Sequence, residues 1–390
     1  MAATQEQLYA GLDLDLSWSE KELPERERTK HVHRLHPYLG KYIPQLVEEL
    51  FRRHVPPRGR VLDPFAGSGT TLVQALESGH DSAGVDIAAF NCLLIRVKTT
   101  AYNPFHLERD LRDALARFER CEGRAGRATP YVRAWFAPQA QDDLLRFRSL
   151  AGDYEHADVL RVVLARAARS ARLTAHFDLD FPKEPQGGPY WCFKHKRECK
   201  PIERADHFIR RYTLDTLARL KDFARVRTAK DVRVLHGDAR HVELGGPFDA
   251  VVTSPPYPGL IDYHEQHRYA YELLGLDDRR ADEIGAAERG TAKASLAAYV
   301  DGIGDVLAAC GASLKPRGRV VIVVNDRRDL YPQILDRAGL TLEQRYERHV
   351  NRRTGRRSGE YFEAVLVATP SRGAGRGRAA GRALPARRTR

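Results

Sequence analysis

Apolar positions along this chain follow two different periods, and the two periods alternate. Short apolar runs, typical of buried strands, predict strands at 60–63, 83–86, 232–235, 248–253 and 318–325, with two later ones at 341–350 and 361–369. Apolar residues three and four positions apart predict helices that begin at Pro44 and near Thr70, and further helices at 295–313 and 331–338. Strands that alternate with helices are typical of a mostly parallel α/β sheet, doubly wound, with helices on both faces.

The middle of the chain interrupts this alternation with helical spacing alone. The helical segments fall at 105–121, 138–150, 156–175 and 203–225. We therefore predict an α/β domain in two parts, 31–102 and 228–369, separated by a largely helical insertion at 103–227. Residues 1–30 predict a loosely packed arm anchored by Leu8, Leu12 and Trp18. The tail 370–390 has seven arginines and no acid, which predicts disorder.

Polar side chains stand where several of the predicted strands end. These side chains are Asp63, Asp86, Asp238 and Ser254. Because ligands of open α/β sheets bind at the carboxyl ends of strands, we expect all four to face one cleft. This convergence is the strongest functional prediction that the residues alone support.

Asp63 opens a glycine-rich turn, Asp-Pro-Phe-Ala-Gly-Ser-Gly-Thr-Thr, that joins a strand to a helix. Glycines let a ligand approach the backbone, and Asp86, 23 residues later, ends the next strand, where an acid can bind ribose hydroxyls. The turn has neither the lysine of a P-loop nor the spacing of a dinucleotide fingerprint. A tight turn in an ordinary α/β protein remains the alternative for this motif alone.

Pro255 and Pro256 end the strand 248–253, because proline cannot continue a sheet ladder. With Ser254 and Tyr257 they form a stiff elbow that offers carbonyl and hydroxyl acceptors beside an aromatic face. Such an elbow suits a planar group that carries an amino donor. Taken by itself, the same stretch is also explained as a proline-rich turn.

A long loop from His176 to Arg197 interleaves aromatic residues with cations, a pattern that suits stacking on bases and pairing with phosphates. Lys194, Lys196 and Arg197 are therefore candidate nucleic-acid contacts. A packed aromatic hinge with solvated basic residues explains the loop equally well.

Three residues near the end of this loop are of metal-binding type. They are Cys192, His195 and Cys199. A tetrahedral zinc site needs four ligands, and no clear fourth ligand lies nearby in the sequence. We therefore predict no metal site.

Composition narrows the class of protein further. The net charge of +12 and the pI near 9.5 favour a polyanionic partner. Five scattered cysteines argue against a disulfide framework, and their odd number fits a reducing cytoplasm. No apolar run approaches membrane-spanning length and the first residues lack a secretory pattern, so we expect a cytoplasmic protein without a membrane partner.

The glycine-rich turn and the elbow, in this order, resemble the S-adenosylmethionine-dependent amino-methyltransferases of DNA, whose fold is Rossmann-like. The stretch from His36 to Pro44, His-Pro-Tyr-Leu-Gly-Lys-Tyr-Ile-Pro, is similar to the family segment that precedes the glycine loop and helps to enclose the methionine part of the cofactor. The resemblance covers roughly 31–100 and 230–369, and the helical middle carries no matching motif.

The resemblance implies S-adenosylmethionine as cofactor and DNA as substrate. It places Asp86 at the ribose hydroxyls, Asp238 at the adenine amino group, and Asp63 near the amino group of the methionine part. It places Ser254 and the Pro255 carbonyl on the target amine, and Tyr257 in a stack with a flipped base. The remaining cofactor contacts that it implies are Lys41, Phe65, Ala66, Gly67, Ser68, Gly69 and Thr70.

Serine before Pro-Pro-Tyr favours cytosine N4 over adenine N6 as the target, and the absence of a Pro-Cys dipeptide argues against methylation at carbon 5 of cytosine. Three alternatives remain: adenine methylation, methylation of a base in RNA, and a binding module without catalysis. The sequence reveals neither the target site nor the oligomeric state. A cognate restriction nuclease or defence system is a candidate partner that the resemblance implies.

Overall fold

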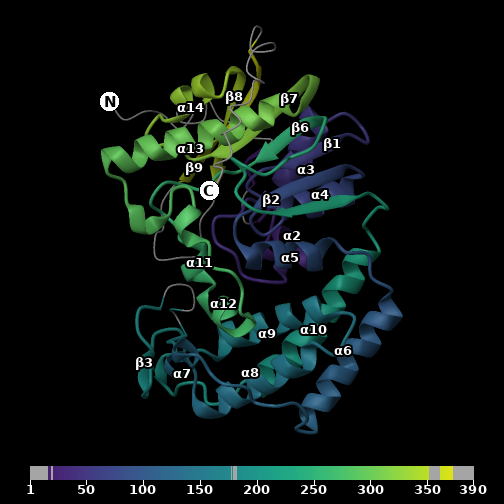
Figure 1. Ribbon diagram of the computed structural model, residues 1–390, viewed down its shortest axis with the longest axis vertical. Coiled ribbons are helices and arrows are strands. Elements are labelled where there is room, and N and C mark those ends of the chain that lie inside the picture. The colour runs from purple at the N-terminus through teal and green to yellow at the C-terminus, as the bar shows by residue number, and fades with distance from the viewer. Residues whose placement is uncertain (1–15, 19–20, 177, 179–181, 351–360, 372–390) are drawn as a thin grey trace, which may run out of the picture.

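Both faces of a seven-stranded sheet are covered by helices in the computed structural model of the chain, which describes residues 16–18, 21–176, 178, 182–350 and 361–371 (Figure 1). The expected arm anchors Leu8 and Leu12 and the tail from residue 372 lie outside these ranges. The third anchor, Trp18, is half-buried against the sheet.

The sheet has the order β5-β2-β1-β6-β7-β9-β8. β9 runs antiparallel to both of its neighbours, and the remaining neighbours in the described sheet are parallel. The chain therefore steps outward from β1 in both directions, which makes the β1–β6 boundary the topological switch point. The strands are β1 (Arg60–Asp63), β2 (Asp81–Asp86), β5 (Val232–His236), β6 (Phe248–Thr253), β7 (Leu314–Val324), β8 (Leu340–Val350) and β9 (Tyr361–Pro370). The predicted Rossmann-like fold, mostly parallel and doubly wound, is confirmed.

Alternate residues of the central strands pack into two different apolar clusters. Val61 contributes to a cluster with helix α3 (Pro44–His54), and Leu62, its neighbour, contributes to a cluster with α13 (Lys293–Ala312) and α14 (Tyr331–Arg337). This alternation follows from the period of two in a strand. The same alternation determines which face of the sheet each side chain points to at the ends of the strands.

The predicted helical insertion forms the lower half of the molecule in Figure 1. Its helices share one apolar cluster with α4 and α5, which cover the sheet. They are α6 (Pro104–Glu119), α7 (Pro130–Trp135), α8 (Pro138–Ala151), α9 (Ala157–Ala171) and α10 (Asp206–Ala224), and the two covering helices are α4 (Thr70–Ser78) and α5 (Ala89–Thr99). The insertion is thus joined to the sheet by a continuous core.

Several elements were not predicted from the sequence. Helices α5 and α7 were missed, and so were α11 (Tyr263–Gln266) and α12 (Arg268–Leu274), which follow the elbow. The predicted loop before α10 contains a small antiparallel hairpin, β3 (Tyr190–Cys192) and β4 (Arg197–Cys199). Short helical segments also precede the sheet, α2 (Glu25–Arg28) and the 3-10 turn η2 (His31–Arg34), and two more 3-10 turns, η3 (Arg280–Asp282) and η4 (Ala287–Arg289), follow α12.

The expectation that no apolar run reaches membrane-spanning length was wrong for α13. Within the described ranges, α13 is the one helix long and apolar enough to cross a membrane by length and composition. Tyr299, Ile303 and Leu307 of this helix are buried in the cluster on the sheet, while Asp301 and Asp305 pair with Arg337. In this structure α13 is therefore a covering helix of the sheet.

Candidate functional site

Two adjoining cavities lie at the carboxyl edge of the sheet. The strand order places Asp238, Asp86, Asp63 and Ser254 one after another along this edge. Asp86 and Asp238 line the larger cavity and Asp63 lines the smaller one, while Ser254 lines both. The expected convergence of the strand ends is therefore observed in the structure.

Asp63 is a buried carboxylate that joins three parts of the site. Its Oδ1 accepts hydrogen bonds from the Thr253 hydroxyl at 2.6 Å and from the Phe65 amide at 3.1 Å. Its Oδ2 accepts from the Thr71 hydroxyl at 2.5 Å and from the Tyr42 hydroxyl at 3.5 Å. Burial raises the pKa of Asp63, against the effect of these donors. The carboxylate thus links β1, the glycine turn, the elbow strand and the segment before α3.

Asp86 holds the glycine turn from the next strand. Its Oδ2 accepts from the Gly67 amide at 2.7 Å, and its Oδ1 accepts from the Ala88 amide at 2.8 Å and from Asn91 Nδ2 at 3.0 Å. Burial raises the pKa of Asp86 to about 7 despite these donors. The carboxyl group lies in the cavity wall with its charge sensitive to pH near neutrality.

Asn91, on α5, is a site residue that the sequence reasoning missed. Its amide nitrogen donates to Asp86 and to the Tyr38 hydroxyl, while its Oδ1 is buried without a hydrogen-bond partner among the described residues. A buried acceptor without a partner is costly, and Asn91 lines the larger cavity. The site therefore offers this oxygen to a ligand that brings a donor.

The two glycines of the turn have different reasons to be glycine. Gly67 has a φ of +51°, and a Cβ there would approach the Tyr38 hydroxyl to 3.1 Å. Gly69 has a φ of +81° at the start of α4, where a Cβ would meet the Ile95 side chain at 2.9 Å. Gly67 thus leaves room in the cavity, whereas Gly69 serves the packing of α4 on α5.

The segment before α3 closes one side of both cavities. The Tyr38 ring stacks on Tyr263 with a centroid distance of 5.3 Å and an interplanar angle of 14°. Lys41 lines the smaller cavity, and its ammonium group donates to the His33 carbonyl at 2.7 Å. Burial lowers the pKa of Lys41 to about 8. Tyr38, Lys41 and Tyr42 thus form one wall of the smaller cavity.

Asp238 lines the larger cavity and forms a salt bridge with Arg240. Arg240 donates to Asp238 Oδ2 from Nη2 at 2.5 Å, and to both carboxylate oxygens from Nε at 2.9 and 3.0 Å. Burial alone would raise the pKa of Asp238, but the hydrogen bonds and charge of Arg240 outweigh it and hold the pKa below its usual range. The carboxylate therefore stays ionised, and the sequence analysis did not foresee this partner.

The elbow is braced from behind. The Tyr299 hydroxyl donates to the Pro256 carbonyl at 2.9 Å, and the Tyr257 hydroxyl lies 3.5 Å from Glu363 Oε1 on β9. Tyr257 packs against the apolar cluster beneath α13. Ser254 and Pro256 line the larger cavity, so this end of the elbow faces the same space as Asp86.

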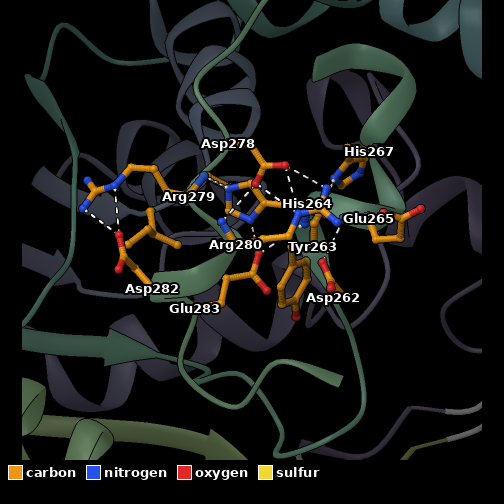
Figure 2. Close-up of polar contacts among 12 residues, drawn as sticks. Asp262, Tyr263, His264, Glu265, His267, Asp278, Arg279, Arg280, Asp282 and Glu283 are labelled. Carbon is orange, nitrogen blue, oxygen red and sulfur yellow. Dashed lines mark hydrogen bonds and ion pairs between the residues drawn. The ribbon is translucent and has the colours of Figure 1, made fainter. Parts of the chain in front are cut away.

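Figure 2 shows the polar network of the opposite wall, between Asp262 and Glu283. His264 Nδ1 is bonded to Glu283 Oε1, which also accepts from the His264 amide at 3.2 Å, and the Arg279 amide donates to His264 Nε2 at 3.2 Å. These bonds hold Tyr263 and Glu283 where both line the larger cavity. The wall is thus a fixed part of the site.

The loop residues predicted to contact nucleic acid lie at the tip of the β3–β4 hairpin, where Lys194, Lys196 and Arg197 are all exposed. The expectation that no fourth metal ligand lies near this tip was wrong. His176, 16 residues before Cys192, joins Cys192, His195 and Cys199 in one cluster. A separation of 16 residues gives no signal in the sequence that His176 lies beside Cys192.

Comparisons with known proteins show which family the chain resembles. Residues 4–96 match the N6/N4 methyltransferase family model, described as a DNA methylase. The chain is 32% identical to the Type II methyltransferase M.MjaII of Methanocaldococcus jannaschii over 93% of this chain and 84% of that protein. It is 38% identical to M.MvaI of Kocuria varians over 21% of this chain and 19% of that protein. With M.BsoBI of Geobacillus stearothermophilus it shares 22% identity over 67% of this chain and 56% of that protein.

Replacing Asp63 tests its linking role. Asp63→Ala leaves the hydroxyls of Thr71 and Thr253 and the Phe65 amide without their acceptor, so we expect a loss of about 3 kcal/mol in the free energy of unfolding. Asp63→Asn keeps one acceptor oxygen and should lose less. Urea denaturation of both variants measures the difference, and a loss for Asp63→Ala below about 1 kcal/mol would contradict the role.

Proposed function

This chain belongs to the Type II DNA methyltransferases of the N6/N4 amino-methylating family, and from that premise we propose that it methylates N4 of cytosine at a specific DNA site. Its cofactor is S-adenosylmethionine. The observation that carries the proposal is the larger cavity, which is lined by Asp86, Asp238 and the elbow residue Ser254.

The residues of the site fit the cofactor. Asp86 and the unpaired Asn91 Oδ1 offer acceptors to ribose hydroxyls, and Asp238 offers one to the adenine amino group. Gly67 leaves room for a ligand against the turn, and Lys41 and Tyr38 close the smaller cavity, in which the methionine part would lie. The other contacts in this cavity are Phe65, Ala66, Ser68 and Thr70. Asp63, whose oxygens already accept from four donors, acts mainly by positioning.

When bound, S-adenosylmethionine supplies an electrophilic methyl group on a sulfonium centre. An exocyclic amine conjugated with its ring is a poor nucleophile, and the elbow corrects this. The Ser254 hydroxyl and the Pro255 carbonyl accept hydrogen bonds from the amine and localise the nitrogen lone pair. Tyr257 stacks on the base, and Tyr299 fixes the elbow through Pro256, so that positioning supplies much of the rate.

The target amine is out of reach inside a stacked duplex, so the base must flip into the cavity. Serine at position 254 favours cytosine over adenine by resemblance to the family. A DNA substrate also fits a cytoplasmic enzyme. The direct test is incubation with methyl-labelled S-adenosylmethionine and DNA, followed by digestion to nucleosides. Label in N4-methylcytosine supports the proposal, whereas label in N6-methyladenine, or transfer to RNA alone, refutes it.

Asp86 makes cofactor binding depend on pH. Because burial raises its pKa to about 7, Asp86 becomes protonated and loses its charge as the pH falls below that value. We expect S-adenosylmethionine affinity to be highest above pH 7 and to fall by up to about tenfold for each pH unit below it. Calorimetry from about pH 5.5 to about pH 8.5, a range that brackets this pKa, measures the change in affinity. Asp86→Asn should bind more weakly with a flat profile, and an unaltered slope in that variant would assign the titration to another group.

Substitutions in the elbow should lower the turnover rate and leave the affinity for the cofactor unchanged. Ser254→Ala removes an acceptor from the target amine, and Tyr257→Ala removes the stacking ring, so each should lower kcat by about 100-fold or more. Calorimetry should show cofactor affinity unchanged within about twofold. Equal losses in both measurements would place these residues at the cofactor instead.

The exposed tip of the β3–β4 hairpin is the proposed DNA contact within the insertion. Alanine at Lys194, Lys196 or Arg197 should weaken DNA binding and lower the slope of log affinity against log salt by about 0.9 for each lost phosphate contact. The exposed Arg225 on the far end of α10 provides a control, Arg225→Ala. If Arg197→Ala alone broadens the set of methylated sites, Arg197 reads a base edge.

Normal DNA binding by all three variants would move the contact elsewhere. A large basic cavity lies between the segment around Tyr38 and helices α9 and α10. Arg166, Arg169 and Arg211 line it, and it would be the next surface to test.

A further inference from the structure

The hairpin carries two buried thiols that have no apolar role. Cys192 is fully buried and Cys199 is 7% exposed, while the other side chains of both strands are exposed or half-buried. Neither cysteine belongs to any of the apolar clusters that the described residues form. Buried cysteines usually pack as small apolar residues, so this pair calls for a different explanation.

Two imidazoles complete the surroundings of the thiols. His195 lies in the hairpin turn, His176 lies in the segment after α9, and one potential ligand atom from each of the four side chains lies within 4.8 Å of the others. The two rings meet edge to face at a centroid distance of 4.7 Å. The His176 amide donates to the Tyr190 hydroxyl at 3.0 Å, which fixes this histidine against β3.

Two sulfur–nitrogen distances in the cluster match an edge of a metal-centred tetrahedron. Zinc–sulfur bonds of about 2.3 Å and zinc–nitrogen bonds of about 2.0–2.1 Å, at the tetrahedral angle, give a sulfur–nitrogen edge of about 3.5–3.6 Å. Cys192 Sγ lies 3.6 Å from His176 Nδ1, and Cys199 Sγ lies 3.5 Å from His195 Nδ1. We propose that His176, Cys192, His195 and Cys199 bind a structural zinc ion that holds the β3–β4 hairpin in place.

The donor set selects the metal and the role. Two thiolates with two imidazoles in tetrahedral positions are typical of zinc, and four protein ligands leave no open position for chemistry. The turn supports this geometry, because the Lys196 amide donates to the Cys192 carbonyl at 2.8 Å and Lys196 has a φ of +54°. Cys192 and His195 are thereby brought to one side of a tight turn, as two ligands of one ion require.

The two other clusters of ligand type in the described residues contain no thiol. His31 pairs with Glu77 at 3.4 Å, and His156 bonds to Asp110 at 2.7 Å. Each is an imidazole–carboxylate pair without a thiolate. The hairpin cluster differs because it contains two buried thiols, on strands of three residues whose cysteines belong to none of the apolar clusters of the described residues.

The hairpin needs such a link to present its tip. An isolated two-stranded hairpin is only marginally stable in water. Trp191 is 56% exposed and Phe193 is 64% exposed, so these rings contribute little burial. Two thiolates neutralise the charge of the ion, so the zinc site adds no net charge beside Lys194, Lys196 and Arg197. Zinc would therefore order the tip without changing its attraction for a polyanion.

Metal analysis of the purified full chain tests the proposal. After reconstitution with zinc and removal of excess, atomic emission should find about one zinc per chain. Cobalt substitution should give the intense visible bands of tetrahedral cobalt and a near-ultraviolet band from thiolate ligands. Less than about 0.1 equivalent of zinc, or an octahedral cobalt spectrum, would overturn the proposal.

Variants identify the ligands. His176→Ala should weaken zinc binding by more than about tenfold, and Cys192→Ser with Cys199→Ser should abolish it and the thiolate band. Cys121→Ser, at an exposed cysteine outside the cluster, is the matched control and should keep full stoichiometry. Loss of zinc in Cys121→Ser, or its retention in the double variant, would place the ion elsewhere. If the double variant does not fold, the cobalt spectrum of the unaltered chain decides the question, because it reports tetrahedral thiolate ligation directly.

Trypsin supplies a readout that is independent of activity. Lys194, Lys196 and Arg197 are exposed cleavage sites on the proposed zinc-bound turn. Zinc should slow cleavage at these positions, and chelation should restore it. Equal rates with and without zinc would show that the ion does not hold the hairpin.

Discussion

The carboxylate of Asp63 is the interaction on which the site depends. It is buried at the end of β1, beside the switch point of the sheet, and accepts hydrogen bonds from the glycine turn, from the elbow strand and from the segment before α3. Each of these parts contributes a wall to the two cavities. A single buried acceptor thus sets the distance between the cofactor turn and the elbow, and its cost of burial is offset only while all of its donors are in place.

The sequence predicted what local patterns determine. Apolar runs located every strand of the large sheet, and the residues that follow them, Asp63, Asp86, Asp238 and Ser254, meet at one edge because parallel strands end together. The hydrogen-bond partners of these residues could not be predicted from the sequence. Asn91 lies on a helix that was not predicted, and Arg240 gives no signal of its bidentate bond to Asp238.

The hairpin escaped prediction for a different reason. Strands of three residues are too short to show alternation, and their exposed aromatic rings look like part of a loop. His176 is distant from Cys192 in the chain and close only in the fold. Periodicity reports how a segment is buried, so it cannot identify contacts that depend on how separate segments return to one place.

The continuous core beneath the helical insertion has a consequence for which parts of the molecule can change independently. Leu160 and Leu217 of the insertion share one apolar cluster with Val73 and Phe90, which belong to the helices over the sheet. Exchanging the insertion between relatives as a cassette would replace half of an interior that has to be packed to high density. Substitutions that leave the fold intact should therefore concentrate at exposed loops such as the hairpin tip, outside this shared interior.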